Sequence, residues 1–249
     1  MIPKVDICVL VHNQLKITKG FIDNLFKFTP SDFNLIFLDN GSTDGTNDFL
    51  KNSDKWQLVT SKTNLGVING RNELFNYVTS DFFINLDNDQ YVCNGWLNKL
   101  FDTYHQGYDI VGCEAWLLTS PKDKKNIVFN GKSIDSGYFP FKKCSTPNED
   151  FSYIGCGGML IRTDIPKSLG LFDSIFNPAY FEDPDFSYKC IKNGYKLGWC
   201  YDCPINHLAH QTFNSQNLFD KNSQFYISWN KFKNKWKDFY PLSRNVRHS

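Results

Sequence analysis

The sequence predicts an α/β protein with a mostly parallel central sheet flanked by helices. Two observations carry this prediction. Over roughly the first 90 residues, apolar runs of strand length alternate with segments of helical periodicity, which indicates repeated β-α-β units. The apolar runs are also continuous, as is typical of strands that are covered on both faces.

The expected elements of the first half alternate along the chain. Strands are expected at 5–11, 33–39, 56–60 and 81–87. Helices are expected at 15–28, 43–52 and 66–78. The first helix ends before Pro30, and Ser42 or Thr43 is the expected N-cap of the second, because a hydroxyl oxygen accepts from the free N–H groups of a first turn.

In the second half the alternation weakens. Helices are expected at 96–105, 183–195 and 218–239, and strands at 108–118, 153–163 and 196–202. The polar segment 119–152 predicts hairpins or loops. The sequence shows neither a repeat nor a clear linker. We therefore expect one domain made of a nucleotide-binding half (1–89), an acceptor and catalytic half (90–217) and a helical tail (218–249).

Composition narrows the function classes. With 249 residues, 41% of them hydrophobic, the chain can bury a sizeable core. The 27 Lys and Arg residues balance 26 Asp and Glu residues, so no net field attracts nucleic acid, and no nucleic-acid partner is expected. Several of the eight cysteines lie in apolar runs, the N-terminus does not resemble a secretory leader, and no window reaches the length of a membrane span. These features predict a cytoplasmic protein with reduced thiols.

Acids and glycines gather where the expected strands end. The first strand leads into Val11, His12 and Asn13, and the second into Asp39 and the segment "DNGSTDGT". In open α/β sheets ligands bind beyond the carboxyl ends of strands, so these segments are expected to open onto one crevice. Asp39 can accept hydrogen bonds from a ligand there. The alternative for "DNGSTDG" is a surface turn, since Asn-Gly and Asp-Gly are common turn pairs.

The fourth strand ends in "LDNDQ", which holds Asp87 and Asp89 one residue apart. Carboxylate oxygens suit a hard divalent cation such as Mg²⁺ or Mn²⁺, and such ions often share their shell with substrate phosphates. The alternative is an exposed Asx turn that ends the strand, and the spacing alone slightly favours that alternative.

A second acid cluster, Glu182, Asp183 and Asp185, stands just before an expected helix. Acids in a first turn are stabilised by the helix dipole, so capping is the simpler interpretation. Aromatic neighbours predict a partly dry site, in which a carboxylate pKa rises and the group can act as a base.

Cysteines and histidines also cluster late in the chain, at Cys200, Cys203, His207 and His210. The spacer between Cys203 and His207 is much shorter than that of a zinc finger, so a structural zinc site is disfavoured. One histidine that joins the Asp89 metal is the preferred interpretation.

Seven motifs in order resemble the family-2 glycosyltransferases of the GT-A fold, over roughly residues 5–212. They are "ICVLVHN", "DNGSTDGT", "NLGVINGRN", "LDND", "GCGGMLIR", "GLFDSIF" and "FEDPDFSYKCIKNGY". The resemblance implies a Rossmann-like GT-A sheet with a smaller acceptor-side β region and a C-terminal helix. It also implies sugar transfer from a UDP-, dTDP- or GDP-linked donor to an acceptor hydroxyl, usually with inversion and with help from Mn²⁺ or Mg²⁺.

The resemblance assigns roles to individual residues. It implies a general base at Asp183 with Glu182 beside it, and metal ligands at Asp89, Asp87 and His207, with His210 as the competing histidine. The residues that it assigns to the nucleotide sugar are Val11, His12, Asn13, Asp39, Arg71, Asp87 and Asn88. His12 departs from the tyrosine that is frequent in the family.

Two alternatives remain beside this interpretation: a sugar nucleotidyltransferase, and a catalytically inactive carbohydrate-binding domain on the same fold. The expected acceptor is a glycan, a lipid-linked sugar or a protein, in polysaccharide or glycan biosynthesis, and 119–152 is expected on the acceptor side. The aromatic, basic tail 218–239 either packs on the core, which its aromatic spacing favours, or makes peripheral membrane contact.

Overall fold

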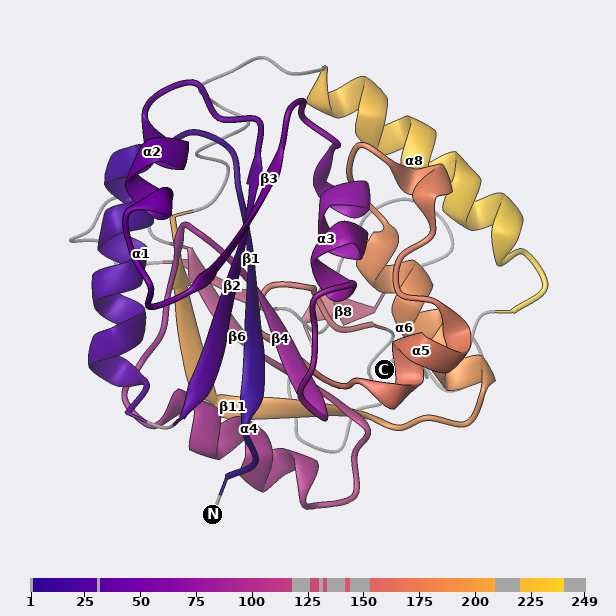
Figure 1. Ribbon diagram of the computed structural model, residues 1–249. Coiled ribbons are helices and arrows are strands. Elements are labelled where there is room, and N and C mark those ends of the chain that lie inside the picture. Colours follow the sequence, from indigo (N-terminus) through magenta and orange to yellow (C-terminus); the bar gives the residue numbers. More distant parts are fainter. Residues whose placement is uncertain are drawn as a thin grey trace.

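The computed structural model describes residues 2–30, 32–117, 126–129, 132–133, 142–143, 153–208 and 220–239 (Figure 1). Its strands are β1 (Val5–Val11), β2 (Phe33–Asn40), β3 (Gln57–Ser61), β4 (Phe82–Asp87), β5 (Gln90–Tyr91), β6 (Ile110–Leu117), β7 (Asn126–Phe129), β8 (Lys132–Ser133), β9 (Lys142–Lys143), β10 (Met159–Arg162) and β11 (Leu197–His207). Its helices are α1 (Leu15–Phe28), α2 (Thr46–Lys51), α3 (Val67–Phe75), α4 (Trp96–Tyr104), α5 (Asp164–Leu169), the 3-10 helix η1 (Ser174–Phe176), α6 (Glu182–Lys192) and α8 (Lys221–Lys235).

A mixed sheet organises the described part of the chain, in the strand order β3-β2-β1-β4-β10-β6-β11-β5, with β7 added on β6. Strands β3, β2, β1 and β4 are parallel, as expected. Strand β10 runs antiparallel to both β4 and β6, so β6 and its parallel neighbour β11 point the same way as β4. The carboxyl ends of β1, β2, β4 and β11 therefore all lie toward one edge of the sheet.

The sheet has an apolar cluster on each face, as its continuous apolar strands predict. Along β1, Val5, Ile7 and Val9 belong to one cluster, which also contains α1 and α4 residues, whereas Cys8 belongs to the other. That second cluster is covered by α3, α5, α6 and α8, which lie together on one side of the sheet in Figure 1. The predicted α/β class with helices on both faces is confirmed.

Element boundaries differ from expectation mainly at glycines. The N-cap of α2 is Gly45 (φ +88°) and not Ser42 or Thr43. Asp44 accepts from the Thr46 backbone N–H at 3.1 Å, and the Ser42 hydroxyl is taken by the Asn13 N–H, so neither hydroxyl residue caps the helix. Strand β10 is shorter than the expected 153–163, because Gly158 turns the chain at φ +84° just before it.

Strand β11 is longer than the expected 196–202 and continues to His207. Its register with β6 shifts between Cys200 and Ile205. Pro204 lies in that interval and lacks the N–H that a ladder position needs, which explains why the strand must break its pairing there. The extension carries the strand to the edge where β4 ends.

The expected loops and hairpins at 119–152 fall largely outside the described residues. Within the described parts, β7 pairs antiparallel with β6, and β8 pairs antiparallel with β9. None of the helices described is both long enough and apolar enough to cross a membrane.

The expectation that the helical tail packs on the core is confirmed. Phe232 on α8 is fully buried, and Trp236, the residue that follows the helix, is 6% exposed; both belong to the cluster under α3 and α6. The outer side of the helix exposes Tyr226 and Ile227.

Candidate active site

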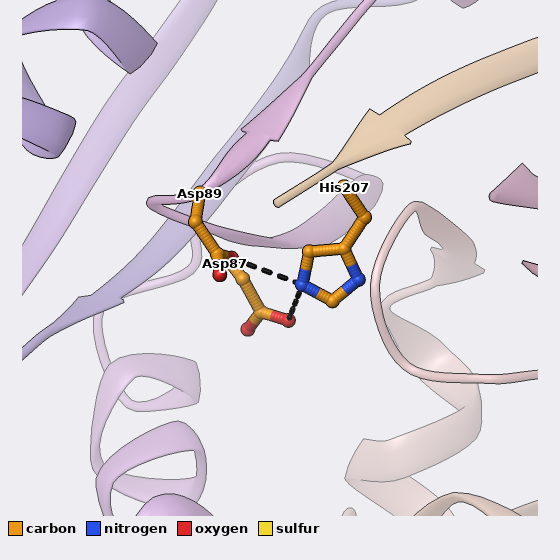
Figure 2. A group of neighbouring side chains, drawn as sticks. All are labelled: Asp87, Asp89 and His207. Carbon is orange, nitrogen blue, oxygen red and sulfur yellow. Dashed lines mark hydrogen bonds and ion pairs between the residues drawn. The ribbon is translucent and has the colours of Figure 1, made fainter. Parts of the chain in front are cut away.

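Asp87, Asp89 and His207 converge at the carboxyl edge of the sheet (Figure 2). One ligand atom from each lies within 4.8 Å of the other two. His207 Nε2 is 3.0 Å from Asp89 Oδ1 and 3.9 Å from Asp87 Oδ2. These three side chains are the group that the sequence predicted as metal ligands. His210 lies outside the described residues.

Backbone pairing explains how residues more than a hundred positions apart meet. Asp87 ends β4, and His207 ends β11. The two-residue strand β5 follows the acids and pairs antiparallel with β11, with His207 opposite Gln90. The Leu208 N–H also donates to the Asp89 carbonyl at 3.0 Å. The turn between Asp87 and Gln90 therefore lies directly against the end of β11.

Gln90 fixes the turn that carries the two acids. Its Oε1 accepts from the Asp87 backbone N–H at 2.9 Å, and its side chain is buried. Gly157 makes room for it, since a Cβ at that position would lie 2.0 Å from Gln90 Nε2. Sequence reasoning missed Gln90 as a site residue. In the sequence, Gln90 is visible only as a glutamine next to the two acids, and this position does not indicate which group its side chain binds.

Arg71 joins the two acid clusters. Its side chain is 7% exposed, and its guanidinium lies 2.6 Å from Asp87 Oδ1 and 3.0 Å from Glu182 Oε1. Burial alone would raise the pKa of Asp87, but Arg71 and His207 hold it below its usual value. Asp87 is thus kept as a carboxylate at the metal-ligand group.

Asp183 stands beside this network, and the Arg71 hydrogen bonds go to its neighbours Glu182 and Asp87. Its Oδ2 accepts from the Cys156 backbone N–H at 3.4 Å. Burial, and then the neighbouring Glu182 carboxylate, raise the pKa of Asp183 well above its usual range. Burial also raises the pKa of Glu182, against the effect of Arg71. The pair thus consists of one carboxylate bound to arginine and one poised to take up a proton. Cys156 is a second contributor that sequence reasoning missed.

The segment before α6 is held in an unusual backbone conformation. Tyr180 and Phe181 have φ of +75° and +70°, the left-handed region that bulky residues rarely adopt. The surrounding structure imposes it: Asn177 donates to the Leu65 carbonyl at 3.0 Å, and the Val67 N–H donates to Pro178 O at 2.8 Å. Such strain clusters at functional sites, and here it immediately precedes Glu182 and Asp183.

The loops after β1 and β2 are tied to each other. The Asn13 N–H donates to the Ser42 hydroxyl at 2.7 Å, and the Thr43 N–H donates back to Asn13 Oδ1 at 2.7 Å. Asp39 lies at the end of β2 opposite Val11 and accepts from the Ser42 N–H at 3.1 Å. Val11, Asn13 and Asp39 therefore meet at one point of the carboxyl edge, as predicted.

His12 and Asn88, which the sequence also assigned to the nucleotide sugar, differ in their hydrogen bonding. His12 carries a buried Nδ1 that has no hydrogen-bond partner within the described residues. Asn88 is buried, and its amide donates to Thr18 of α1 at 2.9 Å. The Asn88 side chain thus anchors the acid-bearing turn to α1.

The Asp87–Asp89–His207 group fits a divalent cation. Two carboxylates and one imidazole are ligands that Mn²⁺ accepts readily, and carboxylates also suit Mg²⁺. Each side chain retains some exposure, with 31% for Asp87, 9% for Asp89 and 24% for His207. A cation could therefore hold further ligands from a substrate, such as phosphate oxygens. These three side chains fit the divalent cation, Mn²⁺ or Mg²⁺, that the sequence predicted.

The fold is of the GT-A type. More particularly, the chain belongs to glycosyl transferase family 2, whose family model matches residues 6–166. No curated protein matches the sequence.

Two solved structures share the fold. GalNAc-T7, determined with UDP, GalNAc and Mn²⁺, superposes with a TM-score of 0.70 at 15% identity, covering 96% of this chain and 49% of that one. The mannosyltransferase PcManGT from Pyrobaculum calidifontis, in complex with GDP-Man and Mn²⁺, gives a TM-score of 0.60 at 15% identity, with 85% and 58% covered. The chain thus spans about half the length of these neighbours.

Proposed function

We propose that this chain transfers a sugar from a nucleoside-diphosphate sugar to an acceptor hydroxyl with inversion, in one displacement assisted by Mn²⁺ or Mg²⁺. The observation that carries the proposal is the convergence of Asp87, Asp89 and His207 at the carboxyl edge, next to the arginine-linked acids Glu182 and Asp183. The similar structures with UDP and Mn²⁺, and with GDP-Man and Mn²⁺, support this class of donor.

The proposed donor side is built from the first half of the chain. Asp39, Val11, His12 and Asn13 would hold the nucleoside at the loops that are tied to each other after β1 and β2. His12 Nδ1, which has no hydrogen-bond partner among the described residues, would bond to it. A divalent cation, when held by Asp89, Asp87 and His207, would offset the charge that develops on the departing diphosphate. The donor is UDP-, dTDP- or GDP-linked in this proposal.

Asp183 is the proposed general base. An acceptor hydroxyl is a poor nucleophile near neutral pH, so a positioned carboxylate must take its proton as the new C–O bond forms. The bond between the sugar carbon and the diphosphate oxygen breaks at the same time, and the diphosphate leaves with the electron pair. Glu182 is bound to Arg71, which orients it and leaves Asp183 as the freer carboxylate.

The proposed setting is cytoplasmic, for synthesis of a polysaccharide or another glycan. The free thiols of the described cysteines support a reducing compartment. The acceptor is proposed to be a glycan, a lipid-linked sugar or a protein. Tyr226 and Ile227, 45% and 48% exposed on α8, are the side chains that would make peripheral membrane contact.

A donor screen tests this function. Purified protein is incubated with a panel of nucleotide sugars, Mn²⁺ and simple acceptors, and free nucleoside diphosphate is measured. We expect release of the diphosphate from at least one donor. Exchange of sugar-1-phosphate with pyrophosphate would instead identify a nucleotidyltransferase. Donor binding without turnover over the whole panel would identify an inactive carbohydrate-binding domain.

Asp183→Asn tests the base, because the amide keeps the shape of the side chain and removes its basicity. We expect turnover to fall by about two to four orders of magnitude while donor affinity is retained. Glu182→Gln is the matched control and should lose less. Normal turnover in Asp183→Asn together with an inactive Glu182→Gln would show that Glu182 is the base.

A further inference from the structure

Four cysteines that the proposed reaction does not use lie close together, on β6, on β11 and after β5. Cys203, on β11, is the centre: its thiol donates to the Trp96 carbonyl at 3.4 Å, and the Trp96 N–H donates to the Cys93 carbonyl at 3.3 Å. The neighbouring thiols of Cys113, Cys200 and Cys93 all raise the pKa of Cys203. Cys113, on β6, and Cys200 are direct partners in the β6–β11 register. Cys113, Cys200 and Cys203 are buried in the same apolar cluster, and Cys93 packs against its edge.

The arrangement does not suit a metal cage. A tetrahedral zinc site holds its sulfurs about 3.8 Å apart, because each Zn–S bond is about 2.3 Å long. Within the residues that the structure describes, only Asp87, Asp89 and His207 form a group of three such ligand atoms all within 4.8 Å of one another. The thiols instead surround Cys203 without closing on a common centre, which favours pairwise sulfur chemistry.

Cys93 differs from the other three thiols in its exposure. It is partly exposed, whereas Cys113 and Cys203 are fully buried and Cys200 is 4% exposed. It lies in the turn between β5 and α4, and its carbonyl accepts from the Trp96 N–H at 3.3 Å. A small oxidant in solvent therefore reaches Cys93 first.

The surroundings of Cys93 also favour its thiolate. The contact with Cys203, followed by the charge of Lys99, lowers the pKa of Cys93 to about 7, against some opposition from burial. Cys203 has a raised pKa and stays a thiol, whose Sγ also lies 3.4 Å from the Trp96 carbonyl. The reactive form in thiol oxidation is the thiolate. One partner is thus exposed and ionisable, and the other is buried and protonated.

We propose that Cys93 and Cys203 form a peroxide-sensitive thiol pair that closes reversibly to a disulfide. The Cys93 sulfur attacks a hydroperoxide, the O–O bond breaks, and Cys93 becomes a sulfenic acid while water or an alcohol leaves. The Cys203 sulfur then attacks the sulfenic sulfur, and its proton leaves with the hydroxyl group as water. Two thiols are oxidised and one hydroperoxide is reduced.

The bond would link two segments that already meet at the active site. Cys93 follows the acid-bearing turn and β5, and Cys203 precedes His207 on β11. Strands β5 and β11 are paired through Tyr91 with Asn206 and Gln90 with His207. A disulfide there would join β11, which carries His207, to the segment that follows the acid-bearing turn. The proposal does not depend on the proposed sugar transfer, since it concerns only the thiols.

Disulfide mapping tests the pair. The folded protein is treated with a small excess of hydrogen peroxide, its free thiols are blocked with N-ethylmaleimide, and its peptides are analysed by mass spectrometry. We expect one cross-linked peptide pair that contains Cys93 and Cys203, with the loss of two hydrogen atoms, and its disappearance after dithiothreitol. In untreated protein, Cys93 should alkylate at least about tenfold faster than Cys190, a buried thiol elsewhere.

Variants separate the two steps. Cys203→Ser should leave a sulfenic acid on Cys93 that dimedone traps, and Cys93→Ser should give neither adduct nor cross-link. Cys190→Ser is the matched control and should leave the cross-link unchanged. The proposal is overturned if Cys93 of the treated wild-type protein is recovered without the cross-link, or is linked to Cys113, Cys144 or Cys200 instead.

Discussion

At the residue scale, Arg71 is the side chain that links the two acid clusters. The family resemblance assigns it to the nucleotide and its phosphates, and that role stays a prediction. In the structure its Nη1 and Nη2 groups donate to Glu182 and Asp87, so its guanidinium sets the positions of two carboxylates. Removal of Arg71 would leave two acids close together without their shared cation, a costly arrangement at a buried site.

Asp6 gives a prediction about stability and pH. It is fully buried and accepts from the N–H groups of Thr79 and Ser80 at 2.6 and 3.0 Å and from the amide of Asn34 at 2.7 Å. Burial would raise the pKa of Asp6, but these hydrogen bonds, led by those from Ser80, lower it below its usual value. The carboxylate therefore stabilises the folded protein above the unfolded-state pKa, and this contribution is lost as the pH falls through the lower folded-state pKa.

Asp6→Asn tests that contribution. We expect the free energy of unfolding to fall by about 1.5–3 kcal/mol at neutral pH, because charge-assisted hydrogen bonds are lost. The difference from the wild type should shrink in urea titrations at about pH 3 and below, where the unfolded-state carboxyl of about pKa 3.9 is protonated. Asp54→Asn, an exposed acid, is the control and should change little. An equal effect of Asp6→Asn at both pH values would show that the Asp6 carboxylate charge does not stabilise the fold.

The sequence allowed the metal-ligand residues to be identified, but not the hydrogen bonds that hold them in place. Asp87, Asp89 and His207 could be grouped because acids at a strand end and a late histidine have recognisable ligand chemistry. Gln90 and Cys156 could not, because one acts through a side-chain bond to a backbone N–H and the other through its own backbone N–H. A pattern of residue types does not encode where such bonds go.

At the element scale, the packing of α8 on α6 was predicted from the sequence, but one of its polar contacts was not. The aromatic spacing predicted a packed helix, and Phe232 and Trp236 are buried. Asp185 was interpreted as a helix-capping acid. It is instead fully buried and bound by Trp236 Nε1 at 2.8 Å and Lys235 Nζ at 2.7 Å. This contact between helices far apart in the sequence has no local signal.

Trp236→Phe tests how much the contact stabilises the helix pair. The change removes the hydrogen bond to a buried carboxylate, so we expect a loss of about 1.5–3 kcal/mol in the free energy of unfolding. Trp229→Phe on the same helix is the matched control, because Trp229 contacts Phe181 and Phe232 through its ring. Chemical denaturation of both variants gives the comparison. A loss in Trp229→Phe as large as that in Trp236→Phe would argue against the role of the hydrogen bond.

At the scale of the whole molecule, the α/β class could be predicted because alternating strands and helices restrict how a sheet is assembled. The position of β10 between β4 and β6 could not, because strand order depends on pairing between distant segments. The extension of β11 to His207 was also missed, although it brings the histidine to the acids. The single-domain organisation expected for residues 1–249 stays a prediction.

The proposed function requires that Asp89 and its partners hold a cation through which a nucleoside diphosphate binds. Calorimetry with UDP, dTDP and GDP, in Mn²⁺ and in a chelator, measures this in the wild type and in Asp89→Ala, with Asp102→Ala as an exposed control on α4. His207→Ala and His210→Ala are compared in the same way to identify the histidine ligand.

We expect at least one nucleotide to bind in Mn²⁺ and to bind at least about tenfold more weakly in chelator and in Asp89→Ala, as the loss of one charge-assisted contact predicts. His207→Ala should weaken binding more than His210→Ala, and Asp102→Ala should bind like the wild type. Binding that is equally tight with and without Mn²⁺, or that is unchanged in Asp89→Ala, would contradict the metal site and with it the proposed function.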